Sequence, residues 1–275
     1  MRNMTGSSLF TNLQFLKLGG SLITDKSQPF TPRPEVLARL AAEIAMAIEK
    51  QPLLRLVLGH GSGSFGHVPA RRHGTRRGVN SPQEWQGFVE VWREAAALNR
   101  LVMDALHAAG LPAIAFPPSA GVSAEDGDVF AWDLSPLRSA LVAGLMPVVY
   151  GDVVFDRRRG GTILSTEDLF VHLARQLHPQ RMLLAGIEPG VWADYPARKQ
   201  IIPEITPAIL EKITRALAGS AATDVTGGMA SKVQQSLALI QEIPGLVVEI
   251  FSGEAPGLLE QALEGKRVGT ILHHP

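Results

Sequence analysis

Short apolar runs alternate with longer amphipathic stretches along this chain. Residues 13–18 and 53–58 are largely apolar, and glycines follow each run, which is typical of a buried strand that ends in a loop. Between them, apolar residues recur every three or four positions from Val36 to Ile48, which predicts an amphipathic helix. The same alternation predicts strands at 112–116, 147–150, 181–187, 246–251 and 269–272, and helices over about 82–109, from 165 onward and over 229–240.

This order of elements favours an α/β fold. Continuous apolar strands are buried on both faces, so the pattern predicts a three-layer α/β/α sandwich with a central, mostly parallel sheet. Ligands of such sheets bind beyond the carboxyl ends of the strands, which is where this sequence has its glycines.

Helix breakers crowd the stretch that follows the predicted strand at 181–187. They indicate a change of lobe near residue 180, and they are Pro189, Gly190, Pro196 and Pro203. We therefore expect a single domain over 1–275 that consists of two lobes, 1–180 and 181–275.

The composition excludes several classes of protein. The chain has 275 residues, of which 45% are hydrophobic, so it is too apolar to be disordered. Lys plus Arg and Asp plus Glu are 26 each, so no overall basic charge attracts nucleic acid. The absence of cysteine excludes disulfides, thiol catalysis and thiolate metal sites.

Neither a secretion signal nor a membrane span is visible in the sequence. Residues 1–12 lack the apolar core of a signal peptide. The longest apolar stretch, near 141–150, is interrupted by Gly144 and Pro147 and falls short of the roughly 18–20 residues of a membrane helix. We expect a soluble, cytoplasmic protein that binds neither nucleic acid nor membrane.

The first candidate site follows the strand at 13–18. It contains Lys17, Gly19, Gly20 and Ser21, with Lys26 close behind. Glycines let backbone N–H groups approach a phosphate, and lysines neutralise its oxygens. The alternative is a plain turn with solvated lysines, but Lys17 lies inside an apolar strand, where a lysine needs a partner.

The second candidate site is GHGSGSFGH at 59–67, after the next strand. Its Gly61, Gly63 and Gly66 match the dinucleotide fingerprint, but arginines follow where that motif needs an acidic residue. The other interpretation is a group of N–H donors at a helix start that binds an anion, with His67 as a further donor. His67 alone would be a structural histidine.

Two further clusters combine a glycine with a charged side chain. In the first, Gly151 and Asp152 end a strand, and the residues after them read as a hairpin turn at 156–161. Ser165 to Asp168 has capping-box spacing, so Asp168 is either a helix cap or lies near a nucleotide or its magnesium. In the second, Gly228 opens a helix that carries Lys232 one turn later, which suits a polyphosphate. The alternative, favoured for this cluster taken alone, is a plain helix start with an exposed lysine.

Taken together, these clusters resemble the amino acid kinase superfamily, and within it the isopentenyl phosphate kinases. The matching segments keep the family order over almost the whole chain: KLGGSLITDK (17–26), GHGSGSFGH (59–67), YGDVVFD (150–156), STEDLF (165–170), DVTGGMASK (224–232), FSG (251–253) and GKRVGT (265–270). One departure is Ser62, where relatives usually have glycine; its side chain either crowds the substrate or adds a donor.

The resemblance implies the amino acid kinase fold and ATP- and Mg²⁺-dependent phosphorylation of isopentenyl phosphate to the diphosphate. It implies acceptor binding in the lobe 1–180 and nucleotide binding in the lobe 181–275, and a homodimer. It assigns ATP binding to Lys17, Gly19, Gly20, Ser21, Gly63, Asp168, Gly228 and Lys232. No side chain is assigned as a metal ligand.

The resemblance also assigns the acceptor and the catalytic groups. Ser62, Gly63, His67 and Gly151 would contact the acceptor. The catalytic residues would be Lys17, Lys26, His67 and Asp152, where Lys26 stabilises the transferring group and Asp152 orients the lysines. We expect the prenyl tail to contact the helix face that carries Trp85, Phe88, Val89 and Trp92.

Other functions remain open at this point. A fosfomycin-kinase-like enzyme, or another small-acceptor kinase of the superfamily, shares the use of a histidine for an anionic acceptor. A non-catalytic nucleotide-binding protein on the same scaffold, or an NAD-binding protein that uses Gly61, Gly63 and Gly66, are alternatives of a different class.

Overall fold

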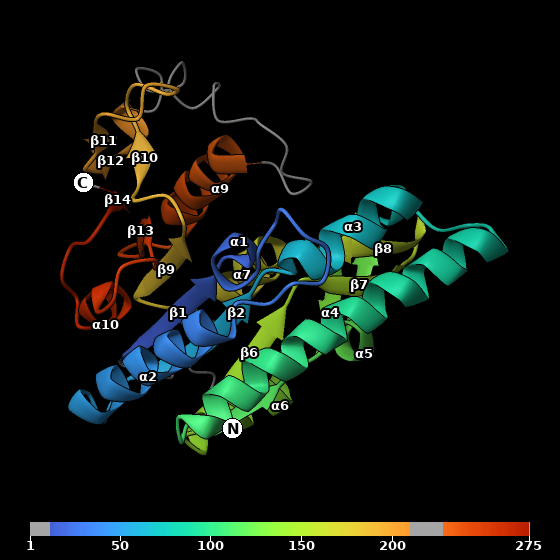
Figure 1. Cartoon of the computed structure of the whole chain (residues 1–275), viewed down its shortest axis with the longest axis horizontal. Helices are drawn as coiled ribbons and strands as arrows, with labels where there is room; N and C mark the ends of the chain where they lie inside the picture. The colour runs from blue at the N-terminus through green and yellow to red at the C-terminus, as the bar shows by residue number, and fades with distance from the viewer. Residues whose placement is uncertain (1–11, 210–227, 275) are drawn as a thin grey trace, which may run out of the picture.

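A computed structural model describes residues 12–209 and 228–274. Its centre is one eight-stranded sheet in the order β12-β14-β13-β9-β1-β2-β6-β3 (Figure 1). The pairs are parallel except β13 with β14. The strands are β1 (Leu13–Leu18), β2 (Arg55–His60), β3 (Ala113–Ala115), β6 (Met146–Tyr150), β9 (Arg181–Gly186), β12 (Glu204–Ile205), β13 (Val247–Ser252) and β14 (Thr270–Leu272).

Helices cover both faces of this sheet. Alternate residues of β1 point to opposite sides: Leu16 packs with one group of helices and Phe15 with the other. The first group is α2 (Pro34–Lys50), α4 (Pro82–Ala108) and α10 (Leu258–Leu263). The second is α6 (Ser135–Val142), α7 (Thr166–Leu177) and α9 (Gly228–Glu242). The predicted three-layer α/β/α sandwich is confirmed.

A second, four-stranded sheet was not predicted. Its order is β5-β4-β7-β8. It is made of the hairpin β4 (Val122–Glu125) and β5 (Asp128–Trp132) and the hairpin β7 (Asp152–Asp156) and β8 (Gly160–Leu164). The predicted turn at 156–161 is confirmed, because β7 and β8 are antiparallel there.

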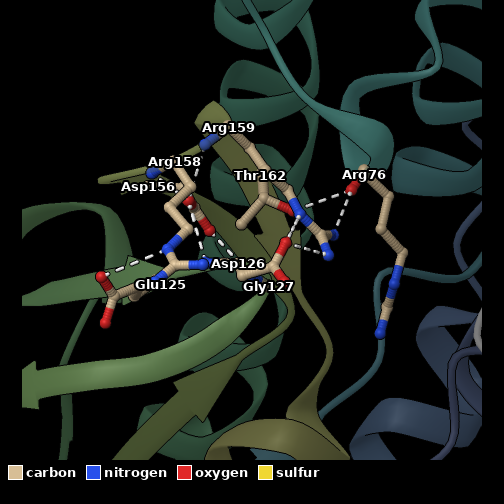
Figure 2. A network of polar contacts seen from close by, with 8 residues as sticks. All are labelled: Arg76, Glu125, Asp126, Gly127, Asp156, Arg158, Arg159 and Thr162. Carbon is tan, nitrogen blue, oxygen red and sulfur yellow. Dashed lines mark hydrogen bonds and ion pairs between the residues drawn. The ribbon is translucent and has the colours of Figure 1, made fainter.

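The carboxylate of Asp156 joins the two hairpins. It accepts hydrogen bonds from the N–H groups of Asp126 and Gly127 in one turn and of Arg158 and Arg159 in the other, at 2.7–3.1 Å (Figure 2). Burial alone would raise the pKa of Asp156, but these four donors hold it below its usual value. The two turns are therefore fixed to one another by a charged group.

The predicted strands and helices are present, with small shifts such as β2, which begins at Arg55 and ends at His60. The short elements are α1 (Gly20–Ile23), α3 (Gly63–His73), η1 (Thr75–Arg77), α5 (Pro118–Gly121), β10 (Val191–Trp192), β11 (Ile201–Ile202) and η2 (Pro207–Ile209).

The predicted lobe boundary near residue 180 falls inside the large sheet. The first strand beyond it, β9, pairs with β1 on one side and β13 on the other. Both predicted lobes therefore share one sheet. Among the described residues, no helix has the length and apolar character needed to cross a membrane.

Candidate active site

A cavity of about 1120 Å³, open to solvent, lies at the carboxyl ends of the central strands. The loops after β1, β2, β6 and β9 meet there, because parallel strands end at the same edge of a sheet. The cavity brings together most of the predicted site residues: Lys17, Gly19, Gly20, Ser21, Lys26, Ser62, Gly63, His67, Gly151 and Lys232. Asp152, Asp168 and Gly228 do not line it.

The glycine turns after β1 and β2 contact one another through main-chain atoms. A Cβ on Gly20 would lie 2.4 Å from the nitrogen of Gly63, and a Cβ on Gly61 would lie 2.8 Å from the nitrogen of Gly20. Gly63 has a φ of +49°, which glycine adopts without strain. Thr24 fastens the contact, since its hydroxyl donates to the carbonyl of Gly20 (2.7 Å) and accepts from the N–H of Ser64 (2.9 Å).

Lys17 forms an ion pair with Glu167, with Nζ 3.0 Å from Oε1. Both side chains are largely buried, 8% and 14% exposed. Burial alone would raise the pKa of Glu167, but the charges of Lys17 and Lys232 and the hydrogen bond from Lys17 lower it overall. Glu167 therefore stays ionised between two cations.

Asp152, which is predicted to orient the lysines, has main-chain partners in this structure, and its role stays a prediction. The Asp152 carboxylate is fully buried and accepts hydrogen bonds from the N–H groups of Ser119 (3.3 Å) and Val153 (2.8 Å). Burial raises its pKa to about 6. The carboxylate that contacts a lysine of the site is Glu167, which the sequence had suggested only through the need of Lys17 for a partner.

Asp168 caps α7, which is one of its two interpretations from the sequence, and its predicted role in ATP binding stays a prediction. The N–H of Ser165 donates to Asp168 Oδ2 (2.8 Å), and the N–H of Asp168 donates to Ser165 Oγ (3.1 Å). The same carboxylate pairs with Arg76 at 3.0 Å. Its oxygens are thus used for the helix start and for an arginine, away from the cavity lining.

On the other wall, α9 begins at Gly228, which has a φ of +66°, and Lys232 lines the cavity one turn later. The part of the DVTGG motif at 224–227 lies outside the described residues. The predicted order of glycine, helix start and lysine is present in the described part of this segment.

His67 lies near the start of α3 and faces the cavity together with Ser62 and Gly66. The Ser62 side chain packs against the main chain of Gly66, where a Cβ would lie 2.4 Å from the Cβ of Ser62. Ser62 is therefore accommodated within the protein by a glycine one turn further along the helix, and its effect on the substrate stays a prediction.

The helix α4, which is predicted to contact the prenyl tail, contributes Val91 and Ala95 to the cavity. Val91 and Ala95 of α4, with Ala70 and Ile163, form an apolar part of the lining. Of the predicted aromatic face, Phe88 and Trp85 pack in the small core that also contains Ala70 and Val91, directly behind this lining, while Val89 and Trp92 are exposed.

His60, beneath the second glycine turn, is buried and stacks on the ring of Tyr150. Burial lowers the pKa of His60 to about 4, so the ring is neutral at pH 7. Its carbonyl accepts a hydrogen bond of 2.6 Å from the hydroxyl of Thr166 in α7. This contact fastens the start of α7, and with it Glu167, to the end of β2.

The donor set fits a polyphosphate better than a metal held by protein alone. The carboxylates of the lining are Glu167 and Glu188, and Glu167 is already paired with Lys17. In the described residues, no group of three or more His, Asp or Glu side chains gathers as a cation site. A Mg²⁺ ion here would depend on the phosphates of a nucleotide for most of its ligands.

Four cationic side chains, Lys17, Lys26, Arg76 and Lys232, and the histidine His67 thus line a cavity that also has an apolar part. An α/β sandwich with this arrangement at its strand ends has the features of a small-molecule kinase.

The model of the amino acid kinase family matches residues 12–250, and the chain belongs to this family. It is 36% identical to an isopentenyl phosphate kinase of Methanothermobacter thermautotrophicus, over 92% of this chain and 96% of that protein. It is 37% identical to an isopentenyl phosphate kinase of Haloferax volcanii, over 95% of this chain and 98% of that protein. A solved structure described as isopentenyl phosphate kinase is similar with a TM-score of 0.79 at 32% identity, over 95% of this chain and 100% of that chain. The resemblance predicted from the sequence is confirmed.

Proposed function

We propose that this chain transfers the γ-phosphoryl group of ATP to the phosphate of isopentenyl phosphate, giving isopentenyl diphosphate and ADP. The observation that carries the proposal is the cavity itself, which joins a wall with Lys17, Lys26 and Lys232 to an apolar wall with Val91 and Ala95. A substrate with a charged end and a short hydrocarbon tail matches both walls. Relatives at 36% and 37% identity that carry this name support it.

The chemistry requires alignment and charge neutralisation. A phosphate monoester has a second pKa of about 6, so it is mostly a dianion at pH 7 and needs no general base. One of its oxygens forms a bond to the γ-phosphorus, the bond from that phosphorus to the β–γ bridging oxygen breaks, and ADP leaves with the electron pair. The obstacle is the repulsion between two anions, which cations and N–H donors reduce.

Each group of the site has a place in this scheme. Lys17, paired with Glu167, and Lys232 contact the phosphates of ATP, and Lys26 stabilises the transferring group. His67, Ser62, Gly63 and Gly151 bind the phosphate of the acceptor. A Mg²⁺ ion supplied with ATP adds charge neutralisation at the β- and γ-phosphates when bound.

The contact between the two glycine turns supports a short distance between the two anions. The turn with Gly20 faces the nucleotide, and the turn with Gly63 begins the helix that carries His67. Because no side chain lies between the turns, donor and acceptor phosphates bound to them approach closely, as in-line transfer requires.

Three expectations belong to this proposal and stay predictions. They are a homodimer, a cytoplasmic location, and the division of acceptor and nucleotide binding between 1–180 and 181–275. Light scattering of the purified chain measures the first, and a crystal structure with both ligands locates the third.

The experiment that tests the proposal is an acceptor panel. ADP release is measured with MgATP and isopentenyl phosphate, dimethylallyl phosphate, fosfomycin or glutamate, with an assay without acceptor as control. Turnover on a prenyl phosphate well above that on the other acceptors is expected. Turnover only on fosfomycin or glutamate refutes the substrate, and MgATP binding without any turnover indicates a nucleotide-binding protein instead.

A further inference from the structure

Arg76 is a charged residue of the cavity for which the family resemblance gives no role. Its backbone lies in η1, directly after α3, and is fixed from the hairpin β7–β8. The carbonyl of Arg76 accepts hydrogen bonds from the hydroxyl of Thr162 (2.9 Å) and from Arg159 Nη1 (3.4 Å) (Figure 2). Arg159 is in turn paired with Asp126, so the position of η1 is set by both hairpins.

The side chain of Arg76 extends away from these hairpins, as Figure 2 shows, and lines the cavity. One guanidinium nitrogen, Nη2, donates to Asp168 Oδ2 at 3.0 Å. The other, Nη1, is buried and has no hydrogen-bond partner within residues 12–209 and 228–274. A buried, charged N–H donor without an acceptor is unfavourable, so this nitrogen marks a place for an anionic oxygen.

The neighbours of Arg76 belong to the part of the cavity that the proposed function assigns to the acceptor. The apolar lining residues Ala70 and Ile163 belong to α3 and β8, and η1 packs against both of these elements and against α4. The partner of Arg76, Asp168, lies in the first turn of α7, and that turn packs beside Gly151, where a Cβ would lie 3.7 Å from the nitrogen of Thr166.

We propose that Arg76 binds the phosphate of the acceptor through Nη1, while Asp168 holds Nη2 and thereby sets the orientation of the guanidinium. This inference rests on the proposed function, since it assigns a ligand to the acceptor phosphate of that reaction. Guanidinium suits the task because it stays charged and donates in a fixed plane to phosphate oxygens. Arg76 also balances the charge that a second dianion brings next to ATP.

The test compares Arg76→Ala and Arg76→Lys with a matched control, Arg77→Ala. Arg77 lies in the same short helix, is exposed, and does not line the cavity. KM and kcat are measured for isopentenyl phosphate and for MgATP, and thermal unfolding is measured for every variant. We expect Arg76→Ala to raise the KM for isopentenyl phosphate about 10- to 100-fold, the effect of one lost charge-assisted hydrogen bond. The KM for MgATP should change less than about twofold, and Arg77→Ala should match the wild type.

Arg76→Lys keeps the charge and loses the planar pair of donors, so its KM for isopentenyl phosphate should lie between those of the wild type and Arg76→Ala. This variant also tests the inference if Arg76→Ala does not fold. An Arg76 variant that matches Arg77→Ala in acceptor KM overturns the inference while the proposed function stands. An equal rise in both KM values together with early unfolding shows a structural role and also overturns it. A wild type without turnover on isopentenyl phosphate overturns the proposed function, and the inference with it.

Discussion

Replacing Glu167 with glutamine keeps the shape of the side chain and removes the charge that faces Lys17 and Lys232. At the observed 3.0 Å, the interaction of the Lys17 and Glu167 charges is worth about 5 kcal/mol at an effective dielectric constant of about 20. Burial offsets part of it, but removal of one partner leaves the other charge buried, which costs about 3–5 kcal/mol. We expect Glu167→Gln to lose about 3 kcal/mol of unfolding free energy, because glutamine retains an acceptor for Lys17.

Urea unfolding, followed by tryptophan fluorescence with and without MgATP, measures this loss. The triphosphate replaces the missing negative charge, so MgATP should stabilise Glu167→Gln more than the wild type. The pKa of Glu167 is lowered on folding, so its contribution is present above the ordinary glutamate pKa of 4.5 and is lost as the pH falls through the folded-state value. The difference between the two proteins should therefore vanish in strong acid. Because Lys17 and Lys232 lose the charge that positions them, Glu167→Gln should also lower kcat on the order of 100-fold.

A suitable control is Glu264→Gln, which removes a carboxylate from exposed pairs with Lys50 and Lys266. Exposed pairs contribute little, so this variant should unfold at the same urea concentration as the wild type. If Glu167→Gln also unfolds there and keeps its kcat, the buried pair does not organise the site, and the reasoning from burial and charge is refuted.

Three further predictions concern the acceptor and the pH dependence. His67→Ala should lower kcat/KM for isopentenyl phosphate about tenfold or more, with the KM for MgATP unchanged; unaltered acceptor kinetics would remove His67 from the acceptor site. Ala95→Leu should fill the apolar wall and raise the KM for isopentenyl phosphate about 10-fold or more, whereas Ala97→Leu, on the exposed side of the same helix, should not; equal kinetics of both variants would show that the tail binds elsewhere. Burial raises the pKa of Asp152 from 3.8 to about 6, so the stability of the wild type relative to Asp152→Asn should fall by roughly 3 kcal/mol as the pH rises from about 4 to about 6; urea titrations across this range that show a constant difference would contradict the shift.

The position of the site was predictable from the sequence, because it depends on a local rule. Glycines directly after the strands at 13–18 and 53–58 had to meet at one edge of a parallel sheet, and they do. The roles of the carboxylates were not predictable in the same way. In STED, capping uses Asp168 and leaves Glu167, one residue earlier on the helix, to face Lys17.

The same distinction holds for the fold. The long periodic helices and apolar strands were predicted nearly to the residue, since burial alone determines them. The helix α3 was predicted only as a helix start in one interpretation of 59–67, because its sequence contains two glycines and Pro69, which are poor helix formers. A contact with a distant residue stabilises this helix: the hydroxyl of Thr24 accepts a hydrogen bond from the N–H of Ser64. Nothing in the sequence indicates that these two residues are partners.

The direct contact of the Gly20 and Gly63 main chains has a consequence for how this enzyme class can change. Main-chain atoms have no rotamers, so the distance between the two turns does not change when the surrounding side chains are substituted. New acceptors can then be gained by remodelling the pocket for the tail, while the gap that the phosphoryl group must cross keeps its length.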